Sequence, residues 1–422
     1  MWVLFIKKIS PLLGIICLLM FLSACGHDTP TLPHPGDLMP PATLPEDSSW
    51  APVTAYPTET DTGTADPVFP SSPAEDPQRA EALIAAQALY QVMDDRDRVF
   101  QLFMVSPEIL GLSPQDAVQE ELHERPVSGL LYSLDWLISP EQAIGLSDSH
   151  AQASPRGIFQ AITAESNQLN KAGLSTNRLF SMFTYRGDGT EKAYRNAELI
   201  AGDVRALGFN MNLAPVADIW EDPLNRFIGD RAYSDSYEKA GPLIGSALQA
   251  FHDRGLISVL KHFPGLGNAS AGEGLPVVFE EAAVLRRKQL QPFAAGIAAG
   301  ADMVLIGNCM VPSVSGAVPA PFSSELVSGL LRGELGFDGV IVCDLSEPAL
   351  YGAGETRPAA CVSALMAGCN LLINPAADAE ELDECVSAIL SALWNAALPR
   401  TFLEDSVIRI LAVKIQYGII EY

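Results

Sequence analysis

Several short apolar runs in the sequence end in charged or polar residues that could do chemistry. Lys261 and His262 follow Ile257-Ser-Val-Leu260, and Asp344 follows Gly339-Val-Ile-Val-Cys343. An ammonium group and an imidazole can donate hydrogen bonds to the hydroxyl groups of a small polar ligand, and a carboxylate can attack an electrophilic carbon. Other runs end in further polar residues, which are Ser147 and Asp148, Asp218, Asn308, and Asn374.

Each of these residues has a simpler explanation when it is taken singly. An Asp or Asn after an apolar run is usually a helix cap or a solvated loop residue. Several of them at the ends of strands in one barrel would instead lie together, because the carboxyl ends of parallel strands meet at one mouth. The sequence therefore predicts one site for a small polar ligand.

The apolar runs themselves predict the strands that position this site. Strands are predicted at residues 129–134, 143–147, 209–214, 257–261, 302–306, 339–343 and 370–373. Helices are predicted at residues 80–103 and, from amphipathic stretches between the strands, at 191–207, 240–254 and 287–299. Strands that are apolar on both faces and alternate with helices form a parallel sheet covered by helices. The fold class is therefore α/β.

A closed barrel fits this pattern better than an open sheet. Residues 79–422 have the length of a (β/α)₈ barrel of the TIM type. The alternative is an open doubly wound sheet, but no G-x-G-x-x-G follows the first predicted strand, which removes the usual dinucleotide chemistry of that fold. We expect residues 79–422 to form a single barrel domain of the catalytic type.

The first 25 residues have the features of an export signal. Lys7 and Lys8 precede the apolar run Pro11–Leu22, and Leu22-Ser-Ala-Cys25 follows. This ending resembles a bacterial lipobox, in which Cys25 is acylated and becomes the mature N-terminus. A transmembrane anchor is the alternative, but the apolar run is shorter than the ~20 residues that span a bilayer. We expect an extracytoplasmic lipoprotein, bound to the cell membrane only through its lipid anchor.

Residues 26–78 differ in composition from both neighbouring regions. Pro recurs there among Thr, Ser, Asp and Gly, with no apolar periodicity. Such a segment cannot bury enough apolar surface to offset its chain entropy. We expect a disordered linker between the anchor and the barrel.

The charge balance and the cysteines exclude several classes of partner. Asp plus Glu number 51 against 26 Lys plus Arg, which gives a formal net charge of −25 and disfavours nucleic acid and anionic lipid. A neutral ligand such as a carbohydrate fits better. The cysteines after Cys25 lack C-x₂-C spacing, so we expect buried free thiols and no metal site, and we expect no cofactor.

Four longer motifs stand in order along the chain. They are Asn212-Leu-Ala-Pro-Val-Ala-Asp218, Asn225 with Ile228-Gly-Asp-Arg231, Lys261-His-Phe-Pro-Gly265-x-Gly267, and Gly336-Phe-Asp-Gly-Val-Ile-Val-Cys-Asp344. Together they resemble the motifs of family 3 glycoside hydrolases, especially the bacterial β-N-acetylhexosaminidases. The likeness spans about residues 85–420, which is essentially all of the predicted barrel domain.

The resemblance implies a retaining mechanism, in which a carboxylate attacks the anomeric carbon and forms a glycosyl-enzyme intermediate. Asp344 matches the position of that nucleophile. Asp148 lies in Ser147-Asp-Ser-His-Ala151, which replaces an Asp-Gln-Glu-Gly-Gly element of the family, and Asn308 replaces a His. We take both as candidates for sugar binding. The remaining sugar-binding positions are matched by Asp218, Arg231, Lys261 and His262.

The loop after Gly265 departs most from the family. The β-N-acetylhexosaminidases carry an Asp-x-His pair there, which acts as general acid/base. Here Gly272 and Gly274 stand at those two positions, in the loop Leu266-Gly-Asn-Ala-Ser-Ala-Gly-Glu-Gly-Leu-Pro276. Glu273 is the only carboxylate in this loop, and it is therefore our candidate proton donor.

Two functions follow from these matches and departures. The first is a retaining exo-glycosidase that acts on N-acetylglucosaminyl residues of cell-wall or related glycans. The second is a catalytically degenerate barrel that binds glycans at the cell surface. Asp344 favours the first, and the missing Asp-x-His pair favours the second.

The linker hypothesis makes a direct prediction. Deleting residues 26–78 should change the thermal unfolding midpoint of the barrel by no more than about 2 °C, because a linker contributes no packing. Differential scanning calorimetry of the deleted chain beside the undeleted one measures this. A markedly lower midpoint would mean that the segment packs on the barrel.

Overall fold

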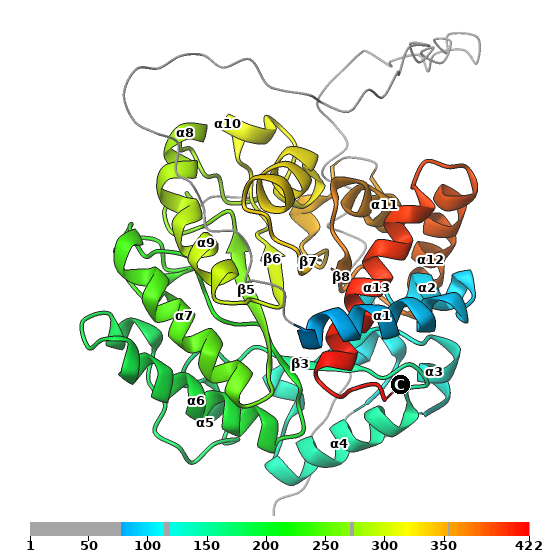
Figure 1. The fold of residues 1–422 in the computed structure, drawn as a ribbon, viewed down its shortest axis with the longest axis horizontal. Helices are drawn as coiled ribbons and strands as arrows, with labels where there is room; N and C mark the ends of the chain where they lie inside the picture. Colours follow the sequence, from blue (N-terminus) through cyan, green and yellow to red (C-terminus); the bar gives the residue numbers. More distant parts are fainter. Residues whose placement is uncertain (1–76, 114–118, 271–273, 353–354, 422) are drawn as a thin grey trace, which may run out of the picture. The chain divides into compact units, whose positions relative to one another are not determined.

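A computed structural model of the protein describes residues 77–421 apart from 114–118, 271–273 and 353–354. Eight parallel strands pair in chain order, and the last pairs with the first to close a barrel (Figure 1). The expected (β/α)₈ fold is therefore confirmed. The strands are β1 Phe103–Val105, β2 Gly129–Leu131, β3 Phe159–Ile162, β4 Met211–Asn212, β5 Ile257–Phe263, β6 Met303–Ile306, β7 Val340–Asp344 and β8 Leu371–Ile373.

Helices connect successive strands and surround the barrel (Figure 1). Those before β5 are α1 Pro77–Gln91, α2 Asp95–Phe100, α3 Gln119–Glu124, α4 Pro140–Ala153, α5 Gln168–Lys171, α6 Thr190–Ala206 and α7 Tyr237–Asp253. Those after β5 are α8 Ala282–Val284, α9 Leu290–Ala298, α10 Pro312–Ser315, the helical segment η7 Glu325–Glu334, α11 Arg357–Ala367, α12 Ala379–Trp394 and α13 Arg400–Gln416. The first and last helices, α1 and α13, pack against each other.

Burial on both faces explains why the strands are apolar. All seven residues of β5 are buried, and so are all four of β3 and of β6. A strand that packs on the barrel interior and on the helices needs apolar side chains at consecutive positions rather than alternate ones. The charged residues at strand ends are therefore exceptions within a continuous apolar core.

The register of β5 shifts at the end of the strand. Lys261 pairs with Leu305 and Phe263 pairs with Ile306, so His262 is an extra residue opposite β6. Such bulges redirect side chains where a strand reaches a functional site. The shift lies at the two residues for which the sequence predicted chemistry.

One predicted strand is wrong. Residues 143–147 lie within helix α4, whose first residue, Pro140, follows the N-cap Ser139. The Ser139 hydroxyl oxygen accepts a hydrogen bond from the Gln142 N–H at 3.2 Å. A five-residue apolar run cannot by itself distinguish a strand from one face of a helix, and the Ser-Pro start of this helix was the available signal.

Two strands of the barrel, β1 and β3, were not predicted. The long helix expected at residues 80–103 is two helices, α1 and α2, followed by β1. Helix α1, as the structure describes it, begins at Pro77 and so includes the last two residues of the predicted linker. The predicted export signal and residues 26–76 of the predicted linker lie outside the described residues.

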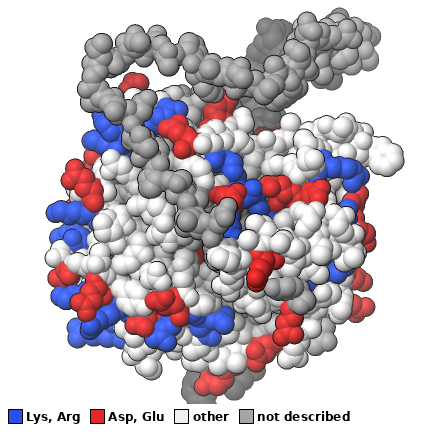
Figure 2. All heavy atoms as spheres, viewed as in Figure 1, with Lys and Arg blue, Asp and Glu red and all other residues white. Residues whose placement is uncertain are grey.

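The described cysteines are buried, and charged side chains of both signs lie on the surface. The five cysteines from Cys309 to Cys385 are buried free thiols, as predicted. Acidic and basic side chains are interspersed on the face shown in Figure 2. Within the part of the chain that the structure describes, no helix is long and apolar enough to cross a membrane.

Candidate active site

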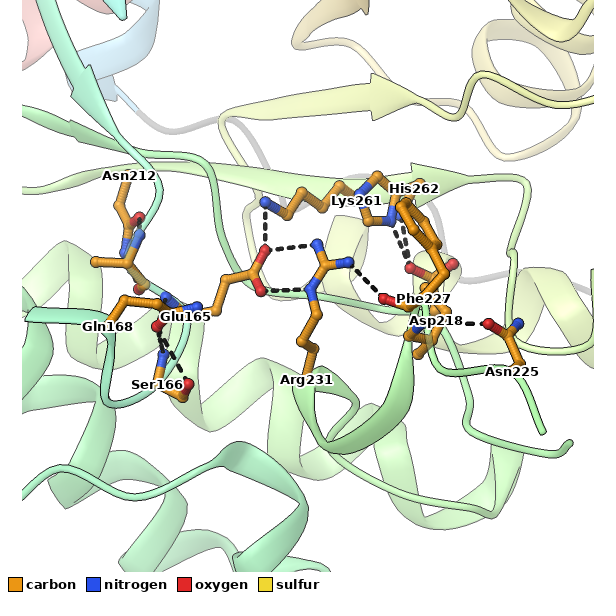
Figure 3. A network of polar contacts seen from close by, with 12 residues as sticks. Glu165, Ser166, Gln168, Asn212, Asp218, Asn225, Phe227, Arg231, Lys261 and His262 are labelled. Atoms are coloured by element: carbon orange, nitrogen blue, oxygen red, sulfur yellow. Dashed lines mark hydrogen bonds and ion pairs between the residues drawn. The ribbon is translucent and has the colours of Figure 1, made fainter. Parts of the chain in front are cut away.

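Three side chains, Glu165, Lys261 and Arg231, form a charged cluster at the carboxyl ends of the strands. The buried carboxylate Glu165, which the sequence did not predict, lies at its centre. It follows β3 and contacts side chains from two other parts of the barrel (Figure 3). Glu165 Oε1 lies 2.5 Å from Lys261 Nζ and 2.8 Å from Arg231 Nη2, and its Oε2 lies 2.6 Å from Arg231 Nε. The guanidinium therefore binds this carboxylate through two parallel hydrogen bonds, which is the strongest arrangement for such a pair.

Local contacts keep Glu165 in this position. The Gln168 side-chain oxygen accepts hydrogen bonds from the backbone N–H groups of Glu165 and Ser166, at 3.1 and 2.6 Å. The Asn212 side chain, at the end of β4, exchanges two hydrogen bonds with the backbone of Ala164, at 2.9 and 2.8 Å. The segment after β3 is therefore fixed to β4 as well as to the helix that follows it.

Burial and ion pairing shift the pKa values of Glu165 and Lys261 in opposite directions. Burial alone would raise the pKa of Glu165, but the charge of Lys261 and the hydrogen bonds from Arg231 lower it to about 2. Burial lowers the pKa of Lys261, and the neighbouring Glu165 carboxylate opposes that shift. Glu165 is therefore ionised at neutral pH because the two cations offset the cost of burying its charge.

Arg231 reaches the cluster from the loop between β4 and α7. It ends the short helical segment η4, Gly229–Arg231, and its Nη1 donates to the Phe227 carbonyl at 2.8 Å. The Asn225 amide in the same loop donates to the Leu266 carbonyl at 2.6 Å and accepts from the Ile228 N–H at 3.2 Å. The loop that carries Arg231 is thereby attached to the segment that follows β5.

His262 is held in place by Asp218. Asp218 Oδ2 lies 2.6 Å from His262 Nδ1, and Oδ1 accepts from the Leu266 N–H at 2.6 Å. Because a carboxylate only accepts, Nδ1 carries the proton and Nε2 of the neutral ring remains an acceptor. We expected Asp218 to bind sugar directly, but its side chain is fully buried and both oxygens are occupied. Asp218 is therefore a positioning residue for His262.

Asp344 stands at the end of β7, where the sequence predicted it. Burial raises the pKa of Asp344, although hydrogen bonds from Ser346 and the charge of Lys261 act in the lowering direction. The Ser346 N–H donates to Asp344 Oδ1 at 2.9 Å. The Asn308 side chain, just after β6, donates to the Asp344 backbone carbonyl at 2.9 Å. Asn308 thus fixes the end of the strand that carries the carboxylate.

A shallow hollow of about 320 Å³ lies at the carboxyl ends of β1, β7 and β8. The Asn374 side chain forms part of it and accepts a hydrogen bond from the Ser106 N–H at 2.6 Å, which joins the ends of β8 and β1. The residues around this hollow are Ser106, Glu108, Ile109, Ser346, Arg357, Asn374 and Ala376.

The structure brings most of the predicted residues to the carboxyl ends of the strands. Asp148 is the exception, because it is exposed on helix α4 and not at a strand end. The prediction was wrong because residues 143–147 form helix rather than strand. Glu273 lies outside the described residues. Among the described residues, no group of three or more His, Cys, Asp or Glu side chains could hold a metal ion.

Glu165 was missed because β3 was missed. The sequence held a local signal, since the apolar run Ile158–Ile162 follows the turn residue Gly157. Nothing local indicated that a carboxylate three residues beyond this run would meet Lys261 and Arg231.

A closed parallel barrel with a charged cluster at the carboxyl ends of its strands is the architecture of a (β/α)₈ enzyme domain. The sequence matches the Glycosyl hydrolase family 3 N terminal domain over residues 95–413. The chain therefore belongs to this family and is a glycoside hydrolase of the β-N-acetylhexosaminidase-like type.

Individual relatives agree with this assignment. The β-hexosaminidase of Stenotrophomonas maltophilia (strain K279a) is 35% identical over 302 residues, which are 68% of this chain and 88% of the relative. That of Xylella fastidiosa (strain M23) is 31% identical over 287 residues, or 65% of this chain and 84% of the relative. A solved family 3 β-N-acetylglucosaminidase from Paenibacillus sp. str. FPU-7 is 31% identical, with a TM-score of 0.70. That match covers 78% of this chain and 63% of the Paenibacillus chain.

The charged cluster makes a prediction about stability. Replacing Glu165 with Gln should lower the free energy of unfolding by about 3 kcal/mol at neutral pH, because Lys261 and Arg231 would keep buried charges without a counter-ion. Since the pKa of Glu165 is lowered from 4.5 to about 2, its stabilisation is complete above pH 4.5. The difference between the two proteins should therefore shrink as the pH falls from 4.5 towards 2.

Urea unfolding at several pH values measures this difference. Glu238→Gln is the matched control, because Glu238 is exposed on α7. Equal stability of Glu165→Gln and the control at neutral pH would contradict the role assigned to the cluster.

Proposed function

We propose that the protein is a retaining exo-β-N-acetylhexosaminidase that acts on cell-wall or related glycans. The observation that carries the proposal is the position of Asp344, a carboxylate at the end of β7 on which the charge of Lys261 acts. A carboxylate at a strand end, beside donors that can bind hydroxyl groups, has the chemistry of a glycosidase nucleophile. The similarity to named β-hexosaminidases supports the choice of sugar.

In the first step of this mechanism, an Asp344 oxygen attacks the anomeric carbon. The bond from that carbon to the leaving-group oxygen breaks, its electron pair stays on the oxygen, and that oxygen takes a proton. In the second step water attacks the glycosyl ester, gives up a proton and releases Asp344 as a carboxylate. Lys261 Nζ and His262 Nε2 would orient the ring through its hydroxyl groups, which is a contribution of positioning rather than of proton transfer.

The proton donor is assigned to Glu273. Ser270 and Val277, which stand on either side of Glu273 in the sequence, pair with each other, and Val277 also pairs with Met310 beyond β6. Both ends of the loop are thus attached at the carboxyl ends of β5 and β6, near the strand that carries Asp344. We assign the role to Glu273 because it is the only carboxylate in this loop and a carboxylic acid can act as a general acid.

One observation favours a second function. Gly274 stands at one of the two positions where the family carries its Asp-x-His pair. If no other group supplies the proton, the barrel would bind a glycan without cleaving it. This alternative is a catalytically degenerate glycan-binding protein.

We also propose that the barrel is held outside the cytoplasm by a lipid on Cys25. The support is the Leu22-Ser-Ala-Cys25 motif after a basic and apolar segment. In this arrangement residues 26–78 would link the anchor to the barrel, and the membrane would be contacted only through the lipid.

The nucleophile prediction separates the two functions. The wild-type protein should hydrolyse an aryl N-acetylglucosaminide faster than the matching glucoside, and Asp344→Asn should hydrolyse neither, because an amide cannot form the glycosyl ester.

Since burial raises the pKa of Asp344, and only the carboxylate attacks, kcat/KM should fall as the pH falls through that pKa. A fluorinated slow substrate should leave a covalent adduct on the peptide that carries Asp344, measured by mass spectrometry. Binding of N-acetylglucosamine with neither turnover nor adduct would establish the degenerate protein instead.

The donor prediction depends on the leaving group. With dinitrophenol, glycosylation needs little proton donation, so Glu273→Gln should glycosylate at about the wild-type rate. With a sugar leaving group the same step should slow by ~10²–10⁴, the usual contribution of a general acid. Pre-steady-state kinetics on the two substrates tests this. Equal rates for Glu273→Gln and wild type on both would remove the assignment of Glu273 without affecting that of Asp344.

A further inference from the structure

Phe227 is a largely exposed aromatic residue at the edge of the charged cluster. It lies in the loop between β4 and α7 and is 58% exposed. Its ring centroid is 5.6 Å from that of His262, and the guanidinium carbon of Arg231 is 5.2 Å from its centroid (Figure 3). No step of the mechanism above uses this ring.

The exposure of the neighbouring side chains shows which end of the site faces solvent. The side chains of Lys261, His262 and Arg231 are 4%, 11% and 26% exposed. Phe227 contacts the last two of these, and it is far more exposed than any of them. The ring therefore lies at the rim, while the polar side chains that would bind a sugar lie progressively deeper.

The backbone holds this ring in place. The Phe227 carbonyl accepts a hydrogen bond from Arg231 at 2.8 Å, and Asn225 ties the same loop to the Leu266 carbonyl. A single exposed apolar residue is ordinary on a protein surface. Phe227 differs because fixed contacts hold it against two side chains of the sugar site, with part of its ring left open to solvent.

We propose that Phe227 is the platform on which the second sugar ring of a β-linked amino-sugar oligosaccharide packs. The proposal rests on the proposed exo-acting function, in which the terminal sugar fills the deep part of the site and the leaving-group sugar projects past the rim. One face of a pyranose ring presents C–H groups, which pack on the face of an aromatic ring and remove apolar surface from water. Phe227 thus selects for the leaving group rather than for the sugar that Asp344 attacks.

Binding measured by calorimetry tests this without depending on turnover. The probes are N-acetylglucosamine and a non-hydrolysable disaccharide of it with a sulfur atom in the β-1,4 linkage. Phe227→Ala should weaken disaccharide binding about tenfold, or about 1.4 kcal/mol, and monosaccharide binding less than about twofold. Phe227→Tyr keeps the aromatic face and should bind both like the wild type.

The control is Trp394→Ala. Trp394 is 84% exposed, and it is the last residue of α12, the helix that leads away from the carboxyl end of β8. Equal losses for the two probes in Phe227→Ala would mean that the ring only supports Arg231 and His262, and would overturn the proposal. So would a wild type that binds the disaccharide no more tightly than the monosaccharide. Binding of both probes without hydrolysis of any aryl glycoside would contradict the proposed hydrolase activity, and the role of Phe227 in binding would still be supported by the difference between the two probes.

Discussion

The structure of the site depends on the pairing of one buried carboxylate, Glu165, with two cations. A charge removed from water is stable only when it is paired and hydrogen-bonded. Glu165 follows β3, Arg231 lies in the loop after β4, and Lys261 lies in β5. Because β3, β4 and β5 are parallel neighbours, their carboxyl ends bring the three groups to one point. The cluster therefore depends on the order and register of these three strands.

Two buried carboxylates, Glu165 and the nearby Asp218, act on the charges of Lys261 and Arg231, so the site suits a neutral ligand. Lys261 and Arg231 are held in place by Glu165, so they can donate remaining hydrogen bonds to hydroxyl groups without needing an anion. His262 offers an acceptor at Nε2 because Asp218 fixes the proton on the other nitrogen. A set of fixed donors beside an acceptor matches a sugar, whose hydroxyl groups both donate and accept.

The proposed catalytic groups are supported by different kinds of structure. Asp344 lies at the end of a buried strand, and Asn308 fixes the backbone there through the Asp344 carbonyl. The candidate donor, Glu273, belongs to a loop whose ends are attached beside β5 and β6. Loops tolerate substitutions that strands in a packed core do not. This difference is consistent with a proposed nucleophile that lies at the end of a buried strand and a proposed acid/base that lies in a loop unlike that of the resembled enzymes.

The sequence by itself determined the fold class and four of the residues around the mouth, Arg231, Lys261, His262 and Asp344. These could be predicted because a buried strand that ends in a charged residue, or a motif several residues long, is a local signal. Only the tertiary structure identified Glu165, since its partners come from other strands, and only it showed that Asp218 supports His262. It also placed Asp148 on helix α4. A short apolar run is compatible with a strand or with one face of a helix, and only tertiary packing distinguishes the two. Local patterns thus specify which residues end the strands, whereas burial and pairing between strands decide what those residues do.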